Sequence, residues 1–321
     1  MLVVAGLQRT GAFDLLTDQL LTHVKSTRAL AAVLVGVCFF TSMLITNDVA
    51  LITFVPLSVL LLGREEHEKL LMFVVILQTI AANLGSSLTP LGNPQNLYLY
   101  SLSGMTLGEF LTVMLVPTVL SAVLLLISIA VIRPKKIDKP VSSNTGESVS
   151  LRRMLPWLAL FALCLLAVLH LVHYLVMLAV VTAAVILLDR SLLKRADYGL
   201  LLTFIGFFVF IGNMKSIPAV SEMLSSLVAG RELVIGVLLS QIISNVPAAM
   251  LLSGFTADYS NLLLGVNLGG LGTLIASMAS MISFKIYAGT PGAKVGKYFL
   301  LFTVLNVVFL AVLLPVMLLI T

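Results

Sequence analysis

The stretch NLGSSLTPLGNPQN, residues 83–96, interrupts an apolar segment that runs from residue 70 to residue 100. It holds two glycines and two prolines within ten residues, a composition that cannot continue a helix facing lipid. Backbone groups that leave a helix in hydrocarbon cost several kcal/mol each, so the interruption must be enclosed by protein or line a cavity. A break of this kind exposes helix N-terminal N–H groups, which attract anions, and C-terminal carbonyls, which coordinate cations. The stretch predicts a binding site inside a membrane protein, with a structural kink as the alternative.

The composition of the whole chain agrees with a membrane setting. Of 321 residues, 60% are apolar and only 10% are charged, and the mean hydropathy is +1.13, outside the range of soluble domains. At about 20 residues per spanning helix, the chain has room for roughly eight to ten membrane-embedded segments. No alternating ten-residue pattern indicates a barrel. These features predict an all-α polytopic membrane protein, in which Cys38 and Cys164 are small core residues.

Apolar runs and one hydrophilic stretch divide the chain. Residues 133–153 contain two prolines, one glycine and several serines, as linkers do, and carry six of the 19 Lys and Arg residues. We therefore expect a first membrane repeat at 1–132, a cytoplasmic linker at 133–153 and a second membrane repeat at 154–321. The apolar runs predict segments at 1–8, 29–62, 70–100, 107–132, 155–172, 174–189, 198–214, 232–252, 261–288 and 298–320.

The distribution of basic residues predicts the orientation. A cytoplasmic linker places most Lys and Arg residues on its own side of a plasma (inner) membrane, as the positive-inside rule requires. This multi-pass topology holds only if segments 29–62 and 232–252 each enter and leave the membrane from the same face. Both segments must then be hairpins.

The first of these hairpins has two interpretations. Residues 29–62 would form a helix about 51 Å long, whereas the hydrocarbon core is about 30 Å thick. The polar break is Thr46-Asn47-Asp48. The hairpin is either an ordinary two-helix excursion with its tip in external water or a re-entrant hairpin with its tip inside the protein. For residues 232–252, with Ser244-Asn245-Val246-Pro247 in the middle, the arms are too short to span, which favours the re-entrant form.

The two halves echo each other. Each hairpin is followed by Asn-Leu-Gly, at residues 83–85 and 267–269, and then by a glycine- and serine-rich interruption. With the linker inside, the two hairpins open to opposite faces, so the repeats are inverted, as in many secondary transporters. Only residues 1–7 precede the first hairpin as an apolar helix, whereas the second half has two extra segments, 155–172 and 174–189. We therefore expect the first repeat to be shortened at its start.

The candidate site residues lie at the hairpin tips and in the two breaks. Asp48 is the only carboxylate deep in an apolar segment and predicts a proton carrier or a cation ligand; if the tip is exposed, it is a helix cap. A sodium ion near Asn47, Asp48 and Asn245 is one expectation. Lys285 either complements an anion or extends to the membrane surface. No cofactor is expected. The substrate and ion candidates are Thr46, Asn47, Asp48, Gly85, Ser86, Ser87, Thr89, Pro90, Gly92, Asn93, Asn96, Ser244, Asn245, Asn267, Gly269, Gly270 and Thr273.

Three of these motifs resemble one group of transporters. With Thr46-Asn47-Asp48, the break at 85–96 and Ser244-Asn245-Val246-Pro247, the whole chain resembles the ion transporter superfamily, which includes arsenite permeases, sodium/proton antiporters and citrate and divalent anion:sodium symporters. The Asn-Asp tip is similar to the arsenite permease branch, and the Thr-Pro-x-Gly-Asn-Pro-Gln-Asn break is similar to the dicarboxylate branch. The resemblance implies two inverted repeats, each with a re-entrant hairpin and a broken helix, that meet at a midplane site, and a homodimer.

Together these observations predict a secondary active transporter and exclude an enzyme, since no metal-ligand cluster or nucleophile arrangement accompanies Asp48. The expected substrate is a small inorganic or organic anion or oxyanion, moved by alternating access and coupled to sodium or protons. The alternatives are a sodium/proton antiporter in which Asp48 titrates, and a non-transporting truncated membrane scaffold. The expected partners are the lipid bilayer and the anion, and no nucleic acid.

Overall fold

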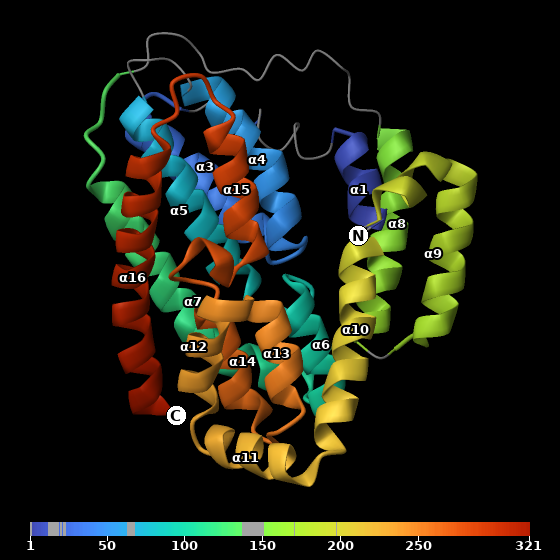
Figure 1. Ribbon diagram of the computed structural model, residues 1–321. Coiled ribbons are helices and arrows are strands. Elements are labelled where there is room, and N and C mark those ends of the chain that lie inside the picture. The colour runs from blue at the N-terminus through green and yellow to red at the C-terminus, as the bar shows by residue number, and fades with distance from the viewer. Residues whose placement is uncertain are drawn as a thin grey trace. The chain divides into compact units, whose positions relative to one another are not determined.

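The computed structural model describes residues 2–11, 19, 21, 24–62, 68–136, 151–169, 171–196 and 198–321. Within these ranges the elements are helices (Figure 1). In chain order they are α1 (Leu2–Arg9), α3 (Thr27–Thr41), α4 (Asn47–Leu62), α5 (Glu68–Ser86), α6 (Pro94–Ser103), α7 (Leu107–Ala130), α8 (Leu151–Val168), α9 (Tyr174–Leu188), η2 (Arg190–Arg195), α10 (Tyr198–Lys215), α11 (Pro218–Val228), α12 (Glu232–Ile243), α13 (Asn245–Ser253), α14 (Tyr259–Leu268), η3 (Leu274–Ala276), α15 (Met278–Ala288) and α16 (Val295–Ile320).

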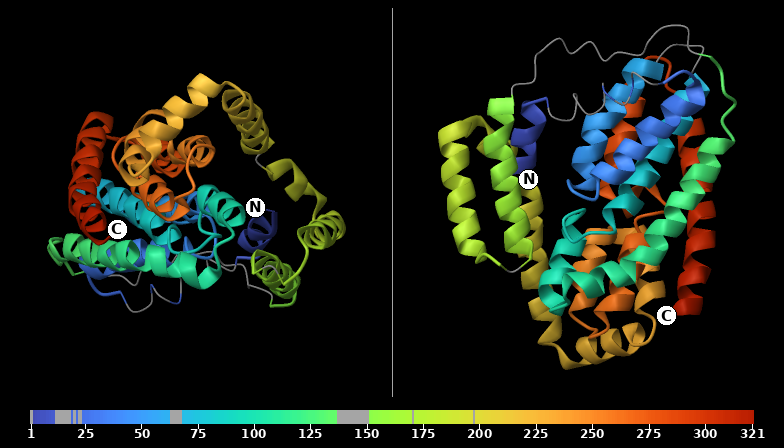
Figure 2. Two further views of the ribbon diagram at one scale, coloured as in Figure 1. Left: turned by 90° about the horizontal axis from the view of Figure 1, so that it is seen from below. Right: turned by 180° about the vertical axis from the view of Figure 1, so that it is seen from behind.

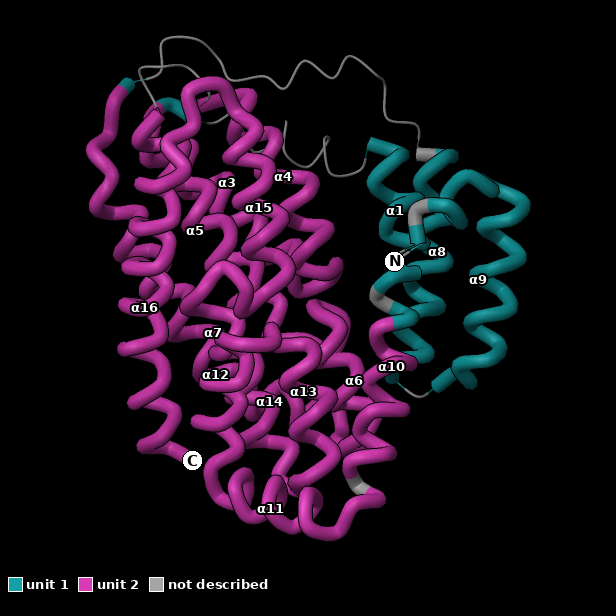
Figure 3. The backbone as a smooth tube through the Cα atoms, viewed as in Figure 1, with its two compact units in different colours: residues 1–25, 136–202 teal, residues 26–135, 203–321 magenta. Residues whose placement is uncertain are grey.

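The chain forms two compact units, which Figure 3 colours separately. Unit 1 comprises residues 1–25 and 136–202, and unit 2 comprises residues 26–135 and 203–321. These units follow packing rather than chain order, so the expected boundaries between two repeats and a linker stay predictions. Helix α8 begins at Leu151, inside the predicted linker 133–153, whose residues 137–150 lie outside the described part of the chain.

Unit 1 packs α1, α8, α9 and η2 around a small apolar core. Val3 and Leu7 of α1 are buried with Trp157 of α8 and Val185 of α9. Gly6 lets α1 approach α8, because a Cβ atom at this position would lie 2.3 Å from the Trp157 ring. At the end of α1, the Arg9 guanidinium pairs with Asp189, which follows α9. This unit holds none of the candidate site residues.

Unit 2 contains two helical hairpins. Helices α3 and α4 form the first, and α12 and α13 form the second. Figures 1 and 2 show α3 and α4 at the upper end of this unit and α12 and α13 at its lower end. Each hairpin packs against a helix that is then interrupted: α3 and α4 against α5, and α12 and α13 against α14. The hairpins therefore meet the interrupted helices from opposite ends of the unit.

The long helices of unit 2 differ in how deeply they are buried. The apolar window of α5 is 83% buried, whereas those of α7 and α16 are 33% and 22% buried. On α16 the buried side chains recur every three or four residues, from Tyr298 to Met317, and the opposite face exposes large apolar side chains such as Leu300 and Leu319. One buried stripe and one exposed apolar face are what lipid contact requires. Helix α5 lies in the protein interior, and α7 and α16 cover it.

The helices agree with a multi-pass membrane protein. Helices α5, α7 and α16 are long and apolar enough to cross a membrane, and one bent pair, residues 201–214 with 218–228, passes the same test. The shorter apolar helices α3, α4, α9 and α12 add to these. The predicted segments 107–132 and 232–252 match α7 and the α12–α13 pair within two residues.

The predicted break of the first hairpin is wrong by a few residues. Helix α3 ends at Thr41 and α4 begins at Asn47, so the break covers residues 42–46 and not Thr46-Asn47-Asp48. The carbonyl of Thr46 already accepts from the Ala50 N–H at 3.0 Å, as in the first turn of a helix. Asn47 and Asp48 therefore start α4 and do not interrupt it.

Candidate functional site

The tip of the α3–α4 hairpin packs against the break between α5 and α6. The Asn47 N–H donates to the Gly92 carbonyl at 3.0 Å, and the Thr89 hydroxyl donates to the Met43 carbonyl. Gly85 permits this approach, because a Cβ atom there would lie 2.2 Å from the Phe39 carbonyl oxygen. Asn47 is 4% exposed. Asn47 at the start of α4 is therefore buried against the break, whereas Leu44 in the tip is 55% exposed.

Asparagine side chains hold the break in α5 and α6 together. Asn93 caps α6, since its Oδ1 accepts from the Asn96 N–H at 2.9 Å, and Pro94 follows in the first turn, where no N–H is needed. The Asn96 Nδ2 lies 3.1 to 3.3 Å from the carbonyl oxygens of residues 86, 87 and 89. These carbonyls lie at the end of α5 and just after it, where no helical N–H pairs with them. One buried amide thus replaces part of the hydrogen bonding that the broken helix loses.

Five asparagines form one buried network across both halves of the chain. Asn93 Nδ2 donates to Asn267 Oδ1 at 3.1 Å, and Asn267 Nδ2 donates to Asn96 Oδ1 at 2.7 Å. Asn47 Nδ2 donates to Asn83 Oδ1 at 3.1 Å. The Ser86 hydroxyl joins the two groups, since it donates to the Asn83 carbonyl at 2.9 Å and accepts from Asn93 Nδ2 at 3.3 Å. All five side chains are at most 4% exposed. We call Asn47, Asn83, Asn93, Asn96 and Asn267 the asparagine network.

Asn83 connects this network to the second break. Its Oδ1 also accepts from the Ser277 hydroxyl at 3.0 Å, and its Nδ2 lies 3.4 Å from the Gly270 carbonyl and from the Ser280 hydroxyl. Gly269 and Gly270 begin the interruption of α14, which continues to Ser277 and includes η3. The interruption is therefore longer than the predicted residues 269–273.

The second hairpin tip has a strained backbone. Ser244 has φ 75° and ψ 154°, and among the described residues it is the only one with positive φ that is not glycine. This conformation is almost confined to glycine, and such strain is concentrated at functional sites. The next residue, Asn245, is 4% exposed and lies beside Gly270, where a Cβ atom would be 3.0 Å from its Nδ2. The strained backbone of Ser244 therefore lies next to Asn245, the polar residue that meets the second break at Gly270.

Two glutamines, which the sequence patterns do not single out, hold the hairpins. Gln78 of α5 is fully buried and lies 3.3 Å from the Leu34 and Phe54 carbonyls, one on each arm of the first hairpin. Gln241 of α12 donates to the Gly269 and Leu271 carbonyls at 2.9 Å and accepts from the Thr273 N–H at 2.9 Å. The only signal for them is an amide in an otherwise apolar helix, which does not reveal its partners.

Helix N-termini gather at the asparagine network. Helices α4, α6, α13 and α15 begin at Asn47, Pro94, Asn245 and Met278, and each of these starts lies at or next to a residue that contacts a network asparagine or a break. Helix N-termini carry partial positive charge and free N–H groups. The buried polar side chains around them are amides and hydroxyls. The arrangement can stabilise an anion without a full positive charge.

Three sequence candidates lie at the margin of this network or away from it. Asp48 is half-buried in the first turn of α4. Thr273 is exposed and reaches the site through Gln241. Lys285 is exposed in the last turn of α15, so of its two interpretations the structure favours extension to the surface. The other candidates lie in the two tips and breaks.

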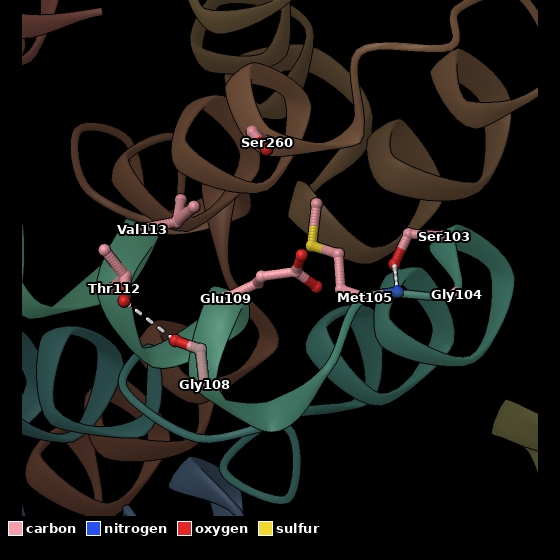
Figure 4. Close-up of a pocket in the computed structure, with 8 residues that line it drawn as sticks. All are labelled: Ser103, Gly104, Met105, Gly108, Glu109, Thr112, Val113 and Ser260. Atoms are coloured by element: carbon pink, nitrogen blue, oxygen red, sulfur yellow. Dashed lines mark hydrogen bonds between the residues drawn. The ribbon is translucent and has the colours of Figure 1, made fainter.

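A separate pocket opens at the end of α6. Its volume is about 680 Å³, and Figure 4 shows its lining, which includes Ser103 at the end of α6, Met105 after it, Glu109 of α7 and Ser260 of α14. Glu109 belongs to a capping box with Thr106, in which each side chain accepts from the other residue's N–H. The pocket contains no residue of the asparagine network and is not the predicted site.

Comparisons with known proteins show what the chain is similar to. A family model described as citrate transporter matches residues 1–261. An uncharacterized transporter of Methanocaldococcus jannaschii is 31% identical over 320 residues, 98% of this chain and 85% of that protein. The inner membrane protein YbiR of Escherichia coli is 30% identical over 291 residues, 89% and 77% of the two chains. A 46 kDa membrane protein of Mycobacterium leprae is 26% identical over 339 residues, 91% and 77% of the two chains.

Proposed function

The chain belongs to the citrate transporter family, and on that premise we propose that it is a secondary transporter that moves a small anion by alternating access. The family and the matched transporters confirm the expected resemblance and the expectation that the chain is not an enzyme. The observation that supports an anion as the substrate is the gathering of helix N-termini around the asparagine network. Amide and hydroxyl donors with partial positive charge bind a small anion and also release it.

The order of helices supports inverted repeats. The first repeat would be a hairpin of 15 and 16 residues (α3 and α4), an interrupted helix (α5 and α6) and a helix of 24 residues (α7). The second would be the α12–α13 hairpin, the interrupted pair α14 and α15, and α16 with 26 residues. The hairpins enter unit 2 from opposite ends, which the inversion requires (Figure 1). Two repeats that meet at one site give the protein two faces to open in turn.

Asp48 restricts the substrate and suggests the coupling. A carboxylate in the first turn of α4 beside Asn47 would repel a dianion, which favours a substrate with a single negative charge or one that carries a cation with it. The same carboxylate, with Asn47 and Asn245, would offer oxygen ligands to sodium or would take up a proton. We propose sodium or protons as the coupling ion. An inner-membrane position, the cytoplasmic linker and a homodimer belong to the same proposal.

Ligand-dependent stability tests this function. We would measure the melting temperature of the purified protein with a panel of small anions, each in sodium chloride and in choline chloride at equal ionic strength. A ligand at 100 times its dissociation constant adds about 2.7 kcal/mol to the stability of the state that binds it. We expect a rise with at least one anion, and that rise should be lost in Asn267→Ala. No rise with any anion in either salt would argue against an anion transporter.

A sodium/proton antiporter is the second candidate, and the half-buried Asp48 is the observation that favours it. In proteoliposomes an antiporter exchanges sodium for protons without any anion. If sodium–proton exchange needs no anion and is lost in Asp48→Asn, the protein is an antiporter and not an anion transporter. A non-transporting scaffold would fail both tests.

A further inference from the structure

Three basic side chains gather where α7 ends and α3 begins. Arg28 lies in the first turn of α3, and Arg133 and Lys135 come shortly after the last residue of α7. Arg133 and Lys135 are exposed, and Arg28 is partly buried. We call these three residues the basic patch. The end of α7 and the start of α3 lie at the upper end of unit 2 in Figure 1.

Thr27 holds the two segments of the basic patch together. Its N–H donates to the Lys135 carbonyl at 2.9 Å, and its hydroxyl accepts from the Lys135 N–H at 3.0 Å. The same hydroxyl donates to the Arg133 carbonyl at 3.1 Å. Thr27 is 3% exposed, so water has little access to these hydrogen bonds. The backbone that carries the patch is therefore fixed without a ligand.

The local sequence places the basic side chains on one side of this backbone. Pro134 separates Arg133 from Lys135, and a proline favours extended backbone in the residue before it. In an extended segment, residues two positions apart lie on the same side. Arg28 Nε donates to the Ile132 carbonyl at 2.7 Å, which fixes its guanidinium beside the segment. The other N–H groups of this guanidinium have no partner among the described residues.

No carboxylate pairs with the basic patch in the part of the chain that the structure describes. The ion pairs found there join Arg9 to Asp189 and Lys294 to Glu68. Cations that gather without counter-charges create a positive potential that attracts anions. The patch is therefore suited to an anionic partner.

A lipid-facing surface adjoins the basic patch. Helix α7 has 24 residues, about 36 Å of helix against a hydrocarbon core of about 30 Å, so its end reaches the membrane surface. Large apolar side chains are exposed just before the patch, with Leu126 at 65% and Val131 at 75%. A phospholipid has the same order of groups, acyl chains and then a phosphate. Basic residues clustered directly after a membrane-spanning helix bind anionic headgroups.

We infer that the basic patch binds the phosphate headgroup of an anionic phospholipid, whose acyl chains lie along the exposed apolar face of α7. Arg28 and Arg133 offer planar guanidinium groups that pair with phosphate oxygens, and Lys135 adds a third positive charge. The bound lipid joins α3, one arm of the first hairpin, to α7. The inference goes beyond the proposed function, because it holds whichever ion the protein carries.

Lipid binding to the purified protein tests the basic patch. The protein would be immobilised on scintillation beads in a neutral detergent and incubated with radiolabelled phosphatidylglycerol at constant ionic strength. The half-saturating lipid concentration is the readout. The patch variant is Arg133→Gln with Lys135→Gln, which keeps the backbone groups that Thr27 contacts. The matched control is Arg231→Gln with Lys285→Gln, which removes the same charge from two exposed positions of unit 2.

A charge-conserving variant separates the effect of charge from an effect on folding. Arg133→Lys with Lys135→Arg replaces the same two residues and keeps both cations. We expect its half-saturating concentration to stay within about two-fold of the native value, since headgroup attraction follows charge. A loss of binding as large as that of the patch variant would overturn charge as the cause.

We expect the patch variant to bind phosphatidylglycerol about thirty-fold more weakly than the native chain, about five-fold for each cation removed. The control should stay within about two-fold, and unlabelled phosphatidylcholine should not displace the label. Equal weakening in the patch variant and the control would overturn the inference, because net charge would then explain both. Equal displacement by phosphatidylcholine would overturn the anionic headgroup. Displacement by millimolar inorganic phosphate would make a free anion, and not a lipid, the occupant.

Discussion

Asn96→Ala should destabilise unit 2 more than the loss of any ordinary surface amide. Asn96 is fully buried, and its Nδ2 serves three carbonyl oxygens of the first break. Its Oδ1 accepts from Asn267 Nδ2 at 2.7 Å. Alanine would leave the Ser86 and Ser87 carbonyls without their side-chain partner, whereas the Thr89 carbonyl keeps the Gly92 N–H and Asn267 Nδ2 keeps the Leu263 carbonyl. Each buried group left unpaired costs about 1–3 kcal/mol, and partial relaxation leaves a total of about 3–5 kcal/mol.

Asn306→Ala is the matched control. Asn306 of α16 is also fully buried, but its Nδ2 donates only to the Phe302 carbonyl of its own helix, and its Oδ1 has no partner among the described residues. Its replacement removes an amide of the same size and leaves no group of another helix unpaired. We expect a loss of about 1 kcal/mol or less.

The assay is thermal unfolding in detergent, followed by far-ultraviolet circular dichroism. The single tryptophan, Trp157, lies in unit 1, so tryptophan fluorescence would report on unit 1 and not on unit 2, which contains Asn96. At a few degrees per kcal/mol, Asn96→Ala should lower the melting temperature by about 10 °C and Asn306→Ala by about 3 °C or less. Equal shifts for the two variants would refute the role of Asn96 in holding the break.

Three further predictions concern the tips. Ser244→Gly should raise stability by about 1 kcal/mol in the same unfolding assay, because glycine relieves the positive φ; a lower melting temperature would show that Ser244 is not strained. Gly85→Ala should lower stability by about 1–3 kcal/mol and weaken anion binding, because its Cβ atom meets the Phe39 carbonyl; unchanged values of both would contradict the close approach. Asp48→Asn should abolish ion-driven uptake while anion exchange persists; undiminished ion-driven uptake would remove Asp48 from coupling.

The sequence predicts the helices of unit 2 well because their signals are local. Apolar runs bounded by charges or turn residues place α7 and α16 within three residues of their starts. Prolines and glycines at 85–94 predict the first break, since Pro90 and Pro94 cannot continue a helix. The break of the first hairpin is predicted a few residues too late, because Asn47 and Asp48 are polar and yet helical.

The contacts between the two halves are not local and were not predictable from one chain. Asn93 and Asn267 are 174 positions apart, and only the packing of α6 against α14 pairs them. Gln78 and Gln241 are single amides in apolar helices, so their partners follow from geometry alone. Lys285 has a charge suited to the site but lies in the exposed last turn of α15. Residue type identifies candidates, and packing decides which of them meet.

Anion counterflow tests the central claim most directly. Proteoliposomes loaded with the anion that stabilises the protein best would be diluted into a trace of the same radiolabelled anion, and the label inside would be followed over time. We expect transient accumulation with the native chain, none with Asn83→Ala and a normal signal with Asn306→Ala. Accumulation by the native chain no greater than that of protein-free liposomes would contradict an alternating-access transporter.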